Sequence, residues 1–338
     1  MDLEVFWFLL LGVLLAGYAI LDGFDLGVGI LHPLARGDEE RRLVMNSIGP
    51  LWDGNEVWLV TFGGALFAAF PEAYATIFSS FHLPFTVVLL ALIGRATSIE
   101  LRSKTPSKWW RTYWDLSFSF SSAVAVFLYG VAAGNIIQGI PVGADLEYAG
   151  DVFDLLSPYP IMVGVLALCA SAMHGALFLR LKVEGELGAR VEKWGWPAFG
   201  TFLAAYMIVT IWTLAKLPHA IETFERWPAA WLVIGFSVLS IAAIPRALLL
   251  GQPRLGFLCS SLTMASLVFA LGMAIFPHLV LSSLGPEGNL DIYRAASSES
   301  TLRLMRTIAF IGLPFVLTYT GLVYWIFRGK TRLDTHSY

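Results

Sequence analysis

The chain has 338 residues, of which 57% are hydrophobic and only 14% are charged, and its net charge at pH 7 is −3. Soluble domains carry about 25% charged residues, so this composition, with a mean hydropathy of +0.69, excludes a soluble globular protein. The small net charge gives no indication of nucleic-acid binding, and both cysteines lie in apolar runs, which argues against a disulfide framework or a cysteine metal site.

Nine apolar runs approach the roughly 20 residues that a helix needs to cross a bilayer. We therefore predict an all-α, polytopic integral membrane bundle of about nine transmembrane helices, forming a single domain over residues 1–338. A weak internal match leaves open a four-plus-four pseudo-repeat, with halves 1–140 and 155–280 followed by the ninth span. The predicted spans are 5–31, 48–70, 78–98, 114–136, 159–180, 196–217, 229–249, 255–277 and 305–327.

The distribution of Lys and Arg predicts the orientation, because cytoplasmic loops of membrane proteins are enriched in these residues. Of the 22 Lys and Arg residues, 16 follow the odd-numbered spans and five follow the even-numbered ones, while Arg95 lies within the third span. We therefore expect the N-terminus outside the cell membrane and the C-terminus in the cytoplasm. The first residues lack the basic region of a signal peptide, so the first run is expected to be a retained span.

Carboxylates interrupt the first two spans near their cytoplasmic ends. Asp22 and Asp25 lie toward the end of the first span, and Asp53 and Glu56 lie at the start of the second. Each pair has i, i+3 spacing and so shares a helix face, and Asp25 and Asp53 are on the order of 10 Å from the cytoplasmic surface. An ionised carboxylate inside a membrane costs roughly 3 kcal/mol on insertion scales. These acids therefore need either a function or a neutralising partner.

Two interpretations of these acids follow, and two further charged residues bear on them. Arg95 lies near the cytoplasmic end of the third span and Glu100 just beyond it. In the functional interpretation the acids form a hydrated proton path from the cytoplasm, because ionisable residues inside membranes mark proton relays. In the structural interpretation they hold helices together, neutralised by Arg95 or by helix N-terminal amides. We favour a proton path for the acids and a counter-ion role for Arg95.

Glycines in the same two spans predict close helix contacts, because small residues let transmembrane helices approach each other. They are Gly23, Gly27 and Gly29 in the first span and Gly63 and Gly64 in the second.

The histidines give no haem-binding pattern. Haem iron takes His and Met as axial ligands, but the six histidines have no paired spacing. We expect packing roles with hydrogen bonds for His82, His174 and His278, no haem ligation by Met273, and solvated positions for His32, His219 and His336. No phosphate loop, nucleophile elbow or metal motif is present, so an autonomous enzyme is not expected. Trp58, inside the second span, is expected either to pack or to line a pore.

Several of these stretches resemble subunit II of cytochrome bd-type quinol oxidases, and the resemblance covers the whole chain. The first span contains LDGFDLGVG at residues 21–29, and the second begins with NSIGPLWDGNEVWL at residues 46–59. Further similar stretches are GGALFAAFP at 63–71, RSK at 102–104, SSLT at 260–263 and THSY at 335–338. Nine spans and the chain length also agree with that family.

The resemblance implies a function that spacing alone does not show. It implies a non-haem subunit of a respiratory quinol:oxygen oxidoreductase in a bacterial or archaeal cell membrane. The partner, subunit I, would carry haem b and haem d and the quinol site, and would reduce dioxygen to water. A small single-span third subunit is left open. This chain would bind no haem itself, and a structural quinone or lipid is left open.

By motif, the resemblance assigns Asp22, Asp25 and Asp53 to the family's proton path and Trp58 to its oxygen access. Arg95 and Glu100 match the family only in position, because their neighbours differ. Together with Glu56 they complete the candidate site. Two rival interpretations remain: a self-contained proton-coupled transporter or channel, and an assembly protein with no part in proton movement.

Overall fold

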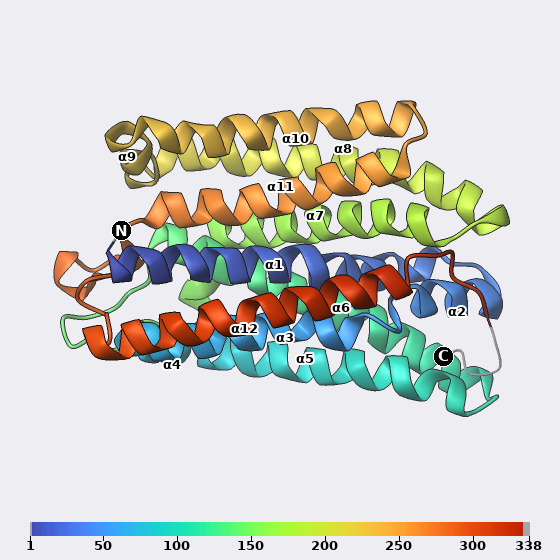
Figure 1. Ribbon diagram of the computed structural model, residues 1–338, viewed down its shortest axis with the longest axis horizontal. Helices are drawn as coiled ribbons and strands as arrows, with labels where there is room; N and C mark the ends of the chain where they lie inside the picture. Colours follow the sequence, from blue (N-terminus) through green and yellow to red (C-terminus); the bar gives the residue numbers. More distant parts are fainter. Residues whose placement is uncertain (1, 334–338) are drawn as a thin grey trace.

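The computed structural model describes residues 2–333, so the THSY motif and His336 lie outside the described residues. The prediction of an all-α membrane protein is confirmed, because long helices make up almost all of the described chain (Figure 1). The helices are α1 Leu3–Leu31, α2 Gly37–Ile48, α3 Trp52–Ala69, α4 Pro71–Ser80, α5 His82–Leu101, α6 Lys108–Gln138, α7 Pro158–Lys182, α8 Gly185–Lys216, α9 His219–Arg226, α10 Trp231–Leu249, α11 Pro253–Ile275 and α12 Glu299–Ile326. Short 3-10 turns and two strands, β1 His278–Val280 and β2 Leu290–Asp291, connect them.

Eight of the described helices are long and apolar enough to cross a membrane. The ninth predicted span, 48–70, corresponds to α3, which has only 18 residues and carries two acids in its first half. Figure 1 shows α3 lying lengthwise in the bundle with α4 at its end, so the two short helices together follow the length of their neighbours.

The largest boundary difference concerns α8, which begins at Gly185 and not at residue 196. Its first turns are polar, so a hydropathy pattern cannot detect them as part of a span. These turns contact α2, where Arg190 donates a hydrogen bond to Glu40. Burial raises the pKa of Glu40, but the bonds from Arg190 and from the Arg36 backbone N–H outweigh it and hold that pKa below its usual value.

Proline and glycine end several helices where the chain turns. Pro33 follows the end of α1 and has no N–H to continue the helix. Pro71 and Pro253 occupy the first turns of α4 and α11, where a missing N–H costs nothing. Gly139, with φ of +93°, and Gly251, with φ of +61°, turn the chain after α6 and α10.

Helix α1 lies at the centre of the bundle and contacts α3, α6, α7 and α11. Its glycines permit these contacts: a Cβ at Gly27 would lie 1.9 Å from the Ser171 backbone oxygen of α7, and one at Gly29 would lie 2.1 Å from Ser122 Oγ of α6. Gly175 of α7 faces Gly27 in return. The predicted close approach is therefore confirmed for Gly27 and Gly29.

For Gly63 and Gly64 the predicted helix neighbour does not lie within this chain, so that part of the prediction stays a prediction. A Cβ added at either position would meet no described atom within 4 Å, so this part of α3 faces away from the bundle. Sequence spacing indicates that small residues are present, but the rotation of the helix decides which neighbour they face.

Helix α12 is the least buried of the long helices. Leu302 is its one buried residue, and it contacts mainly α1 and α3, beside which it lies in Figure 1. Many large apolar side chains along it are exposed, among them Phe315 and Tyr319.

The two ends of the bundle differ in structure and charge. At the end that holds α9, the connection after α6 pairs with the connection after α11, through Ile140 N to Leu281 O at 2.9 Å and Ser283 N to Ile140 O at 2.9 Å. At the other end lie α2 and the loops that carry most Lys and Arg residues (Figure 1). We call these the α9 end and the α2 end.

Candidate functional site

A buried arginine brings together acids from two other helices. Arg95 of α5 is fully buried, and its Nη2 lies 2.7 Å from Asp22 Oδ1 of α1. The same nitrogen lies 3.9 Å from Asp25 Oδ2, and Nη1 lies 3.0 Å from Glu56 Oε1 of α3. We call these four residues the Arg95 cluster. Arg95 therefore lies among the acids for which a counter-ion was predicted.

An amide and a phenol complete the surroundings of Asp25. Asn55 Nδ2 donates to Asp25 Oδ2 at 2.7 Å and to Leu21 O at 3.2 Å. Tyr324 of α12 donates its hydroxyl to Asn55 Oδ1 at 3.0 Å. Asn55 therefore links α1, α3 and α12 around one carboxyl group.

The Arg95 cluster holds more carboxyl groups than its cation can neutralise. With all three acids ionised, one guanidinium would face three negative charges. Asp22 and Asp25 are fully buried; Asp22 Oδ1 has only its ion pair with Arg95, and Asp22 Oδ2 and Asp25 Oδ1 accept no hydrogen bond among the described residues. Excess buried charge costs several kcal/mol. The cluster is therefore a place where binding a proton relieves repulsion, which is the property that a proton-holding site needs.

Helix α3 carries two acids with different exposure. The Glu56 side chain is 25% exposed, so it reaches from Arg95 to the surface. Asp53 is exposed, one helical turn earlier on the same face of α3. Within the described residues no hydrogen bond or ion pair joins Asp53 to Arg95. Asp53 is therefore not a counter-ion of Arg95 in this chain.

Glu100 and Trp58 lie apart from the charged groups of the cluster. Glu100 is exposed near the end of α5, and no hydrogen bond or ion pair in the described chain joins it to the other site residues. Trp58 is buried, and its ring covers Gly17 of α1, where a Cβ would lie 2.3 Å from Trp58 Cε3. The packing interpretation of Trp58 therefore has a structural basis.

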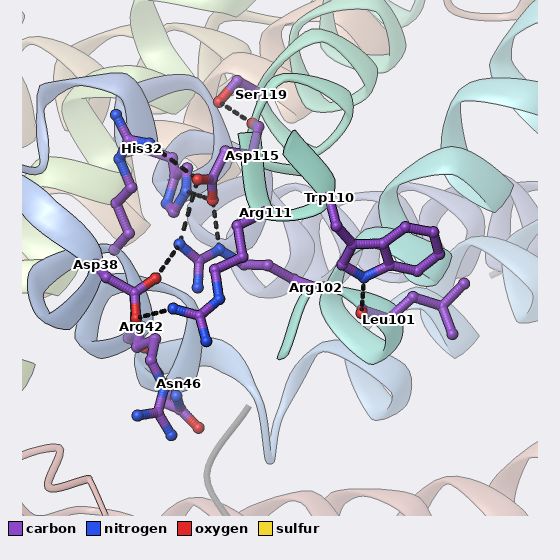
Figure 2. A network of polar contacts seen from close by, with 11 residues as sticks. His32, Asp38, Arg42, Asn46, Leu101, Arg102, Trp110, Arg111, Asp115 and Ser119 are labelled. Carbon is purple, nitrogen blue, oxygen red and sulfur yellow. Dashed lines mark hydrogen bonds and ion pairs between the residues drawn. The ribbon is translucent and has the colours of Figure 1, made fainter. Parts of the chain in front are cut away.

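A second polar cluster lies at the α2 end and is shown in Figure 2. Asp115 of α6 accepts hydrogen bonds from Arg102 Nε to Oδ1 at 2.5 Å and from Arg102 Nη2 to Oδ2 at 3.2 Å. His32 Nε2 lies 2.7 Å from Oδ1, and Arg41 Nη1 donates to Oδ2 at 2.9 Å. We call Asp115, His32, Arg41 and Arg102 the Asp115 cluster.

A surface acid extends the Asp115 cluster. Asp38 of α2 lies 3.0 Å from Arg102 Nη2 and 2.9 Å from Arg111 Nη1, so it bridges two cations (Figure 2). The cluster joins α2, α6 and the turns that follow α1 and α5.

The expectation that His32 is solvated is wrong. His32 is 1% exposed and faces Asp115. Its position at a span end suggested solvent, but α6 and α2 pack against that end. His174 has the predicted packing role: it is fully buried, with Nδ1 2.7 Å from Ser260 Oγ and Nε2 2.9 Å from Ile20 O.

Sequence reasoning missed the Asp115 cluster and the two residues beside the Arg95 cluster, Asn55 and Tyr324. Arg102 appeared only as part of a motif. It comes shortly after the third predicted span, and Asp115 stands at the start of the fourth, so the pair was a usable signal. Asn55 stood in the second motif without a role. Tyr324 had no signal, because it lies 269 residues from Asn55 in the chain.

Comparison with known proteins gives consistent results over the full length. A family described as cytochrome bd terminal oxidase subunit II matches residues 3–327. The chain is 35% identical to cytochrome bd-I ubiquinol oxidase subunit 2 of Escherichia coli over 99% of this chain and 98% of that protein. It is 34% identical to cytochrome bd ubiquinol oxidase subunit 2 of Bacillus subtilis over 97% of each.

Among solved structures, the chain is similar to one from the bd oxidase of Geobacillus thermodenitrificans. The TM-score is 0.79 and the sequence identity 19%, over 97% of this chain and 99% of the other. This match supports the fold.

Proposed function

Since the chain belongs to the cytochrome bd terminal oxidase subunit II family, we propose that it is a subunit of a membrane-bound respiratory quinol oxidase and that its own task is to deliver protons. Haem b, haem d and the reactions of quinol and dioxygen belong to a second subunit. Protons for reducing dioxygen to water reach that subunit through this chain.

The observation that carries this proposal is the excess of carboxyl groups in the Arg95 cluster. Asp22, Asp25 and Glu56 surround one guanidinium, so the cluster can take up and release a proton while Arg95 keeps part of its charge balanced. Glu56 connects the buried pair to the surface of α3. Proton relays inside membranes are built from such acids.

The outer part of the proposed path is Asp53. It is exposed on α3 and precedes Glu56 by one helical turn. An exposed carboxylate would be costly against lipid, so we propose that Asp53 faces water or a polar group at the contact with the partner subunit. Glu100, also exposed, is kept as a second proposed acid at the α2 end.

The proposed contact with the partner includes the open face of α3. Gly63 and Gly64 face no described atom, although small residues on membrane helices serve close helix packing. Helix α12 beside it is almost wholly exposed. A second polytopic subunit would cover both. A third small subunit, a structural quinone and an oxygen route at Trp58 find no specific support in the described contacts.

The α2 end is the proposed cytoplasmic side, because Lys and Arg gather there. We propose with it a cytoplasmic C-terminus, an N-terminus outside, and an Asp115 cluster at the cytoplasmic surface.

Two alternatives are less favoured. A self-contained transporter is not supported, since the relatives across the full length are oxidase subunits. A pure assembly role would leave the unbalanced carboxyl groups without a use.

The test uses Asp53→Asn in the intact oxidase complex. Asn keeps the size and polarity of Asp53 but cannot carry a proton, so turnover should fall roughly 10- to 100-fold while haem content stays normal. Asp53→Glu should keep part of the activity. Oxygen consumption with quinol and the haem spectrum are measured on the same preparation.

Glu72→Gln is the matched control, because Glu72 is an exposed acid at the start of α4, away from the cluster. It should leave both readouts unchanged. Full activity of Asp53→Asn would remove Asp53 from the path. Loss of haem with Asp53→Asn would favour an assembly role.

A further inference from the structure

A cavity of 790 Å³ lies at the α2 end between the ends of α7, α11 and α12. This volume is in the range of small-molecule sites. None of the four residues of the Arg95 cluster and none of the Asp115 cluster lines it, and the one residue it shares with the surroundings of the Arg95 cluster is Tyr324, which donates to Asn55.

The charge of the cavity is one-sided. Five cations line it and, among the described residues, no carboxylate does; the cations are Arg180, Lys182, Arg254, Arg328 and Lys330. Its remaining walls are apolar and aromatic, with Phe178 and Phe257 on one side and Tyr324 and Phe327 on the other.

Two of the cations have a structural role. Lys182 donates to the Phe327 carbonyl at the end of α12, and Lys330 donates to Val183 O at 2.8 Å, at the end of α7. Each lysine thus satisfies carbonyls that a helix end leaves unpaired. These bonds join the segment after α12 to the end of α7, and so they position one wall of the cavity.

Two of the three arginines, Arg254 and Arg328, are exposed and retain donors for a ligand. Arg180 is buried and adds positive charge to the wall, with its Nη2 3.1 Å from Glu192. Arg254 is exposed at the rim. Arg328 stacks on Trp325, with the guanidinium carbon 4.6 Å from the ring centroid, and one of its nitrogens donates to the Trp325 carbonyl. Exposed guanidinium donors in a lining that holds no carboxylate among the described residues favour an anionic ligand.

We propose that this cavity binds the headgroup of an anionic phospholipid. Arginine donors match phosphate oxygens in geometry and charge, and basic pockets between membrane helices on the cytoplasmic side hold such headgroups. The acyl chains lie along α11, whose Leu255 and Leu258 are exposed beside the rim. The apolar walls and these side chains favour a lipid over a free anion.

The test is lipid binding to the intact, delipidated oxidase complex, measured by native mass spectrometry. The probes are dioleoylphosphatidylglycerol, dioleoylphosphatidylcholine and inorganic phosphate. The variant is Arg254→Gln with Arg328→Gln, which removes two exposed rim charges. Since a basic residue near an anionic lipid contributes about a factor of five, phosphatidylglycerol should bind the variant roughly 10- to 30-fold more weakly.

The matched control is Lys104→Gln with Lys193→Gln, two exposed lysines at the same end but outside the cavity. It should bind phosphatidylglycerol as the unaltered complex does. An equal loss in both variants, equal binding of phosphatidylcholine, or displacement of phosphatidylglycerol by phosphate would each overturn the proposal. The proposal would also be overturned if the unaltered complex bound no phosphatidylglycerol and the rim variant lost its partner subunit. That combination of results would mean that a protein segment, and no lipid, fills the cavity. The readout does not depend on turnover, so it is separate from the test of proton delivery.

Discussion

The two buried polar clusters are built in opposite ways. The Arg95 cluster has one cation and three carboxyl groups, and several of its oxygens lack hydrogen bonds in the described chain. The Asp115 cluster has one central carboxylate held by Arg102, Arg41 and His32, and both of its oxygens accept bonds. An excess of acids favours proton binding, whereas a carboxylate surrounded by donors stays ionised and serves as a clamp.

The difference shows that a buried acid in a membrane protein does not by itself mark a proton path. What matters is the ratio of acids to cations and the number of unpaired oxygens around it. By this criterion Asp25 belongs to a site that can change its protonation, and Asp115 belongs to a joint between helices.

The largest effect is expected from breaking the Asp115 cluster. Asp115→Asn leaves Arg102, which is 1% exposed, without its main partner. Removing one member of a buried ion pair costs about 3–5 kcal/mol, so the yield and thermal stability of the complex should fall sharply. Thermal unfolding followed by tryptophan fluorescence measures this change.

Asp38→Asn is its control, because Asp38 also contacts Arg102 but its side chain is 42% exposed. Exposed pairs contribute about 0–1 kcal/mol, so the loss should be much smaller. A stable Asp115→Asn complex with slow turnover would contradict the distinction between the two clusters.

The opposite pattern is expected from Asp25→Asn. The amide can still accept the bond from Asn55, and Arg95 keeps Asp22 and Glu56. The fold should therefore be retained with a full haem complement, while oxygen consumption drops roughly 10- to 100-fold. A variant that loses stability and keeps its specific activity would show that the Arg95 cluster is itself a clamp.

The smallest effect is expected from Tyr324→Phe, which tests how far the Arg95 cluster depends on its neighbours. It removes the hydroxyl that donates to Asn55, a hydrogen bond worth about 1 kcal/mol. Stability should fall by about that amount and turnover by severalfold at most. Tyr319→Phe, on an exposed part of the same helix, should change neither. Equal effects of Tyr324→Phe and Tyr319→Phe on stability and turnover would show that Asn55 does not need the hydrogen bond from the Tyr324 hydroxyl.

Much of the fold and part of the site could be predicted from sequence. Apolar runs predicted where the long helices lie, eight of which are long and apolar enough to cross a membrane, and depth along them placed Asp22, Asp25, Glu56 and Arg95 at one level. Depth does not determine rotation about a helix axis, which is why Asp53 is exposed while Asp25 is buried. Rotation also decides that Gly27 meets α7 whereas Gly63 faces open space.

Contacts between distant segments were beyond sequence reasoning for a different reason. His32 is buried because α6 and α2 both pack against the turn after α1, and Tyr324 reaches Asn55 from the far end of the chain. Such contacts depend on tertiary packing, and a local sequence pattern carries no information about which distant segments pack together.

The bond between Tyr324 and Asn55 also has a consequence for biosynthesis. At about 5–20 residues per second, the 269 residues between them take on the order of 10–60 s to translate. During that interval α1, α3 and α5 can already be in the bilayer, with Asn55 lacking its donor from α12. The nascent protein therefore inserts its acidic helices well before the helix that completes their surroundings, and α12 closes the structure late in translation.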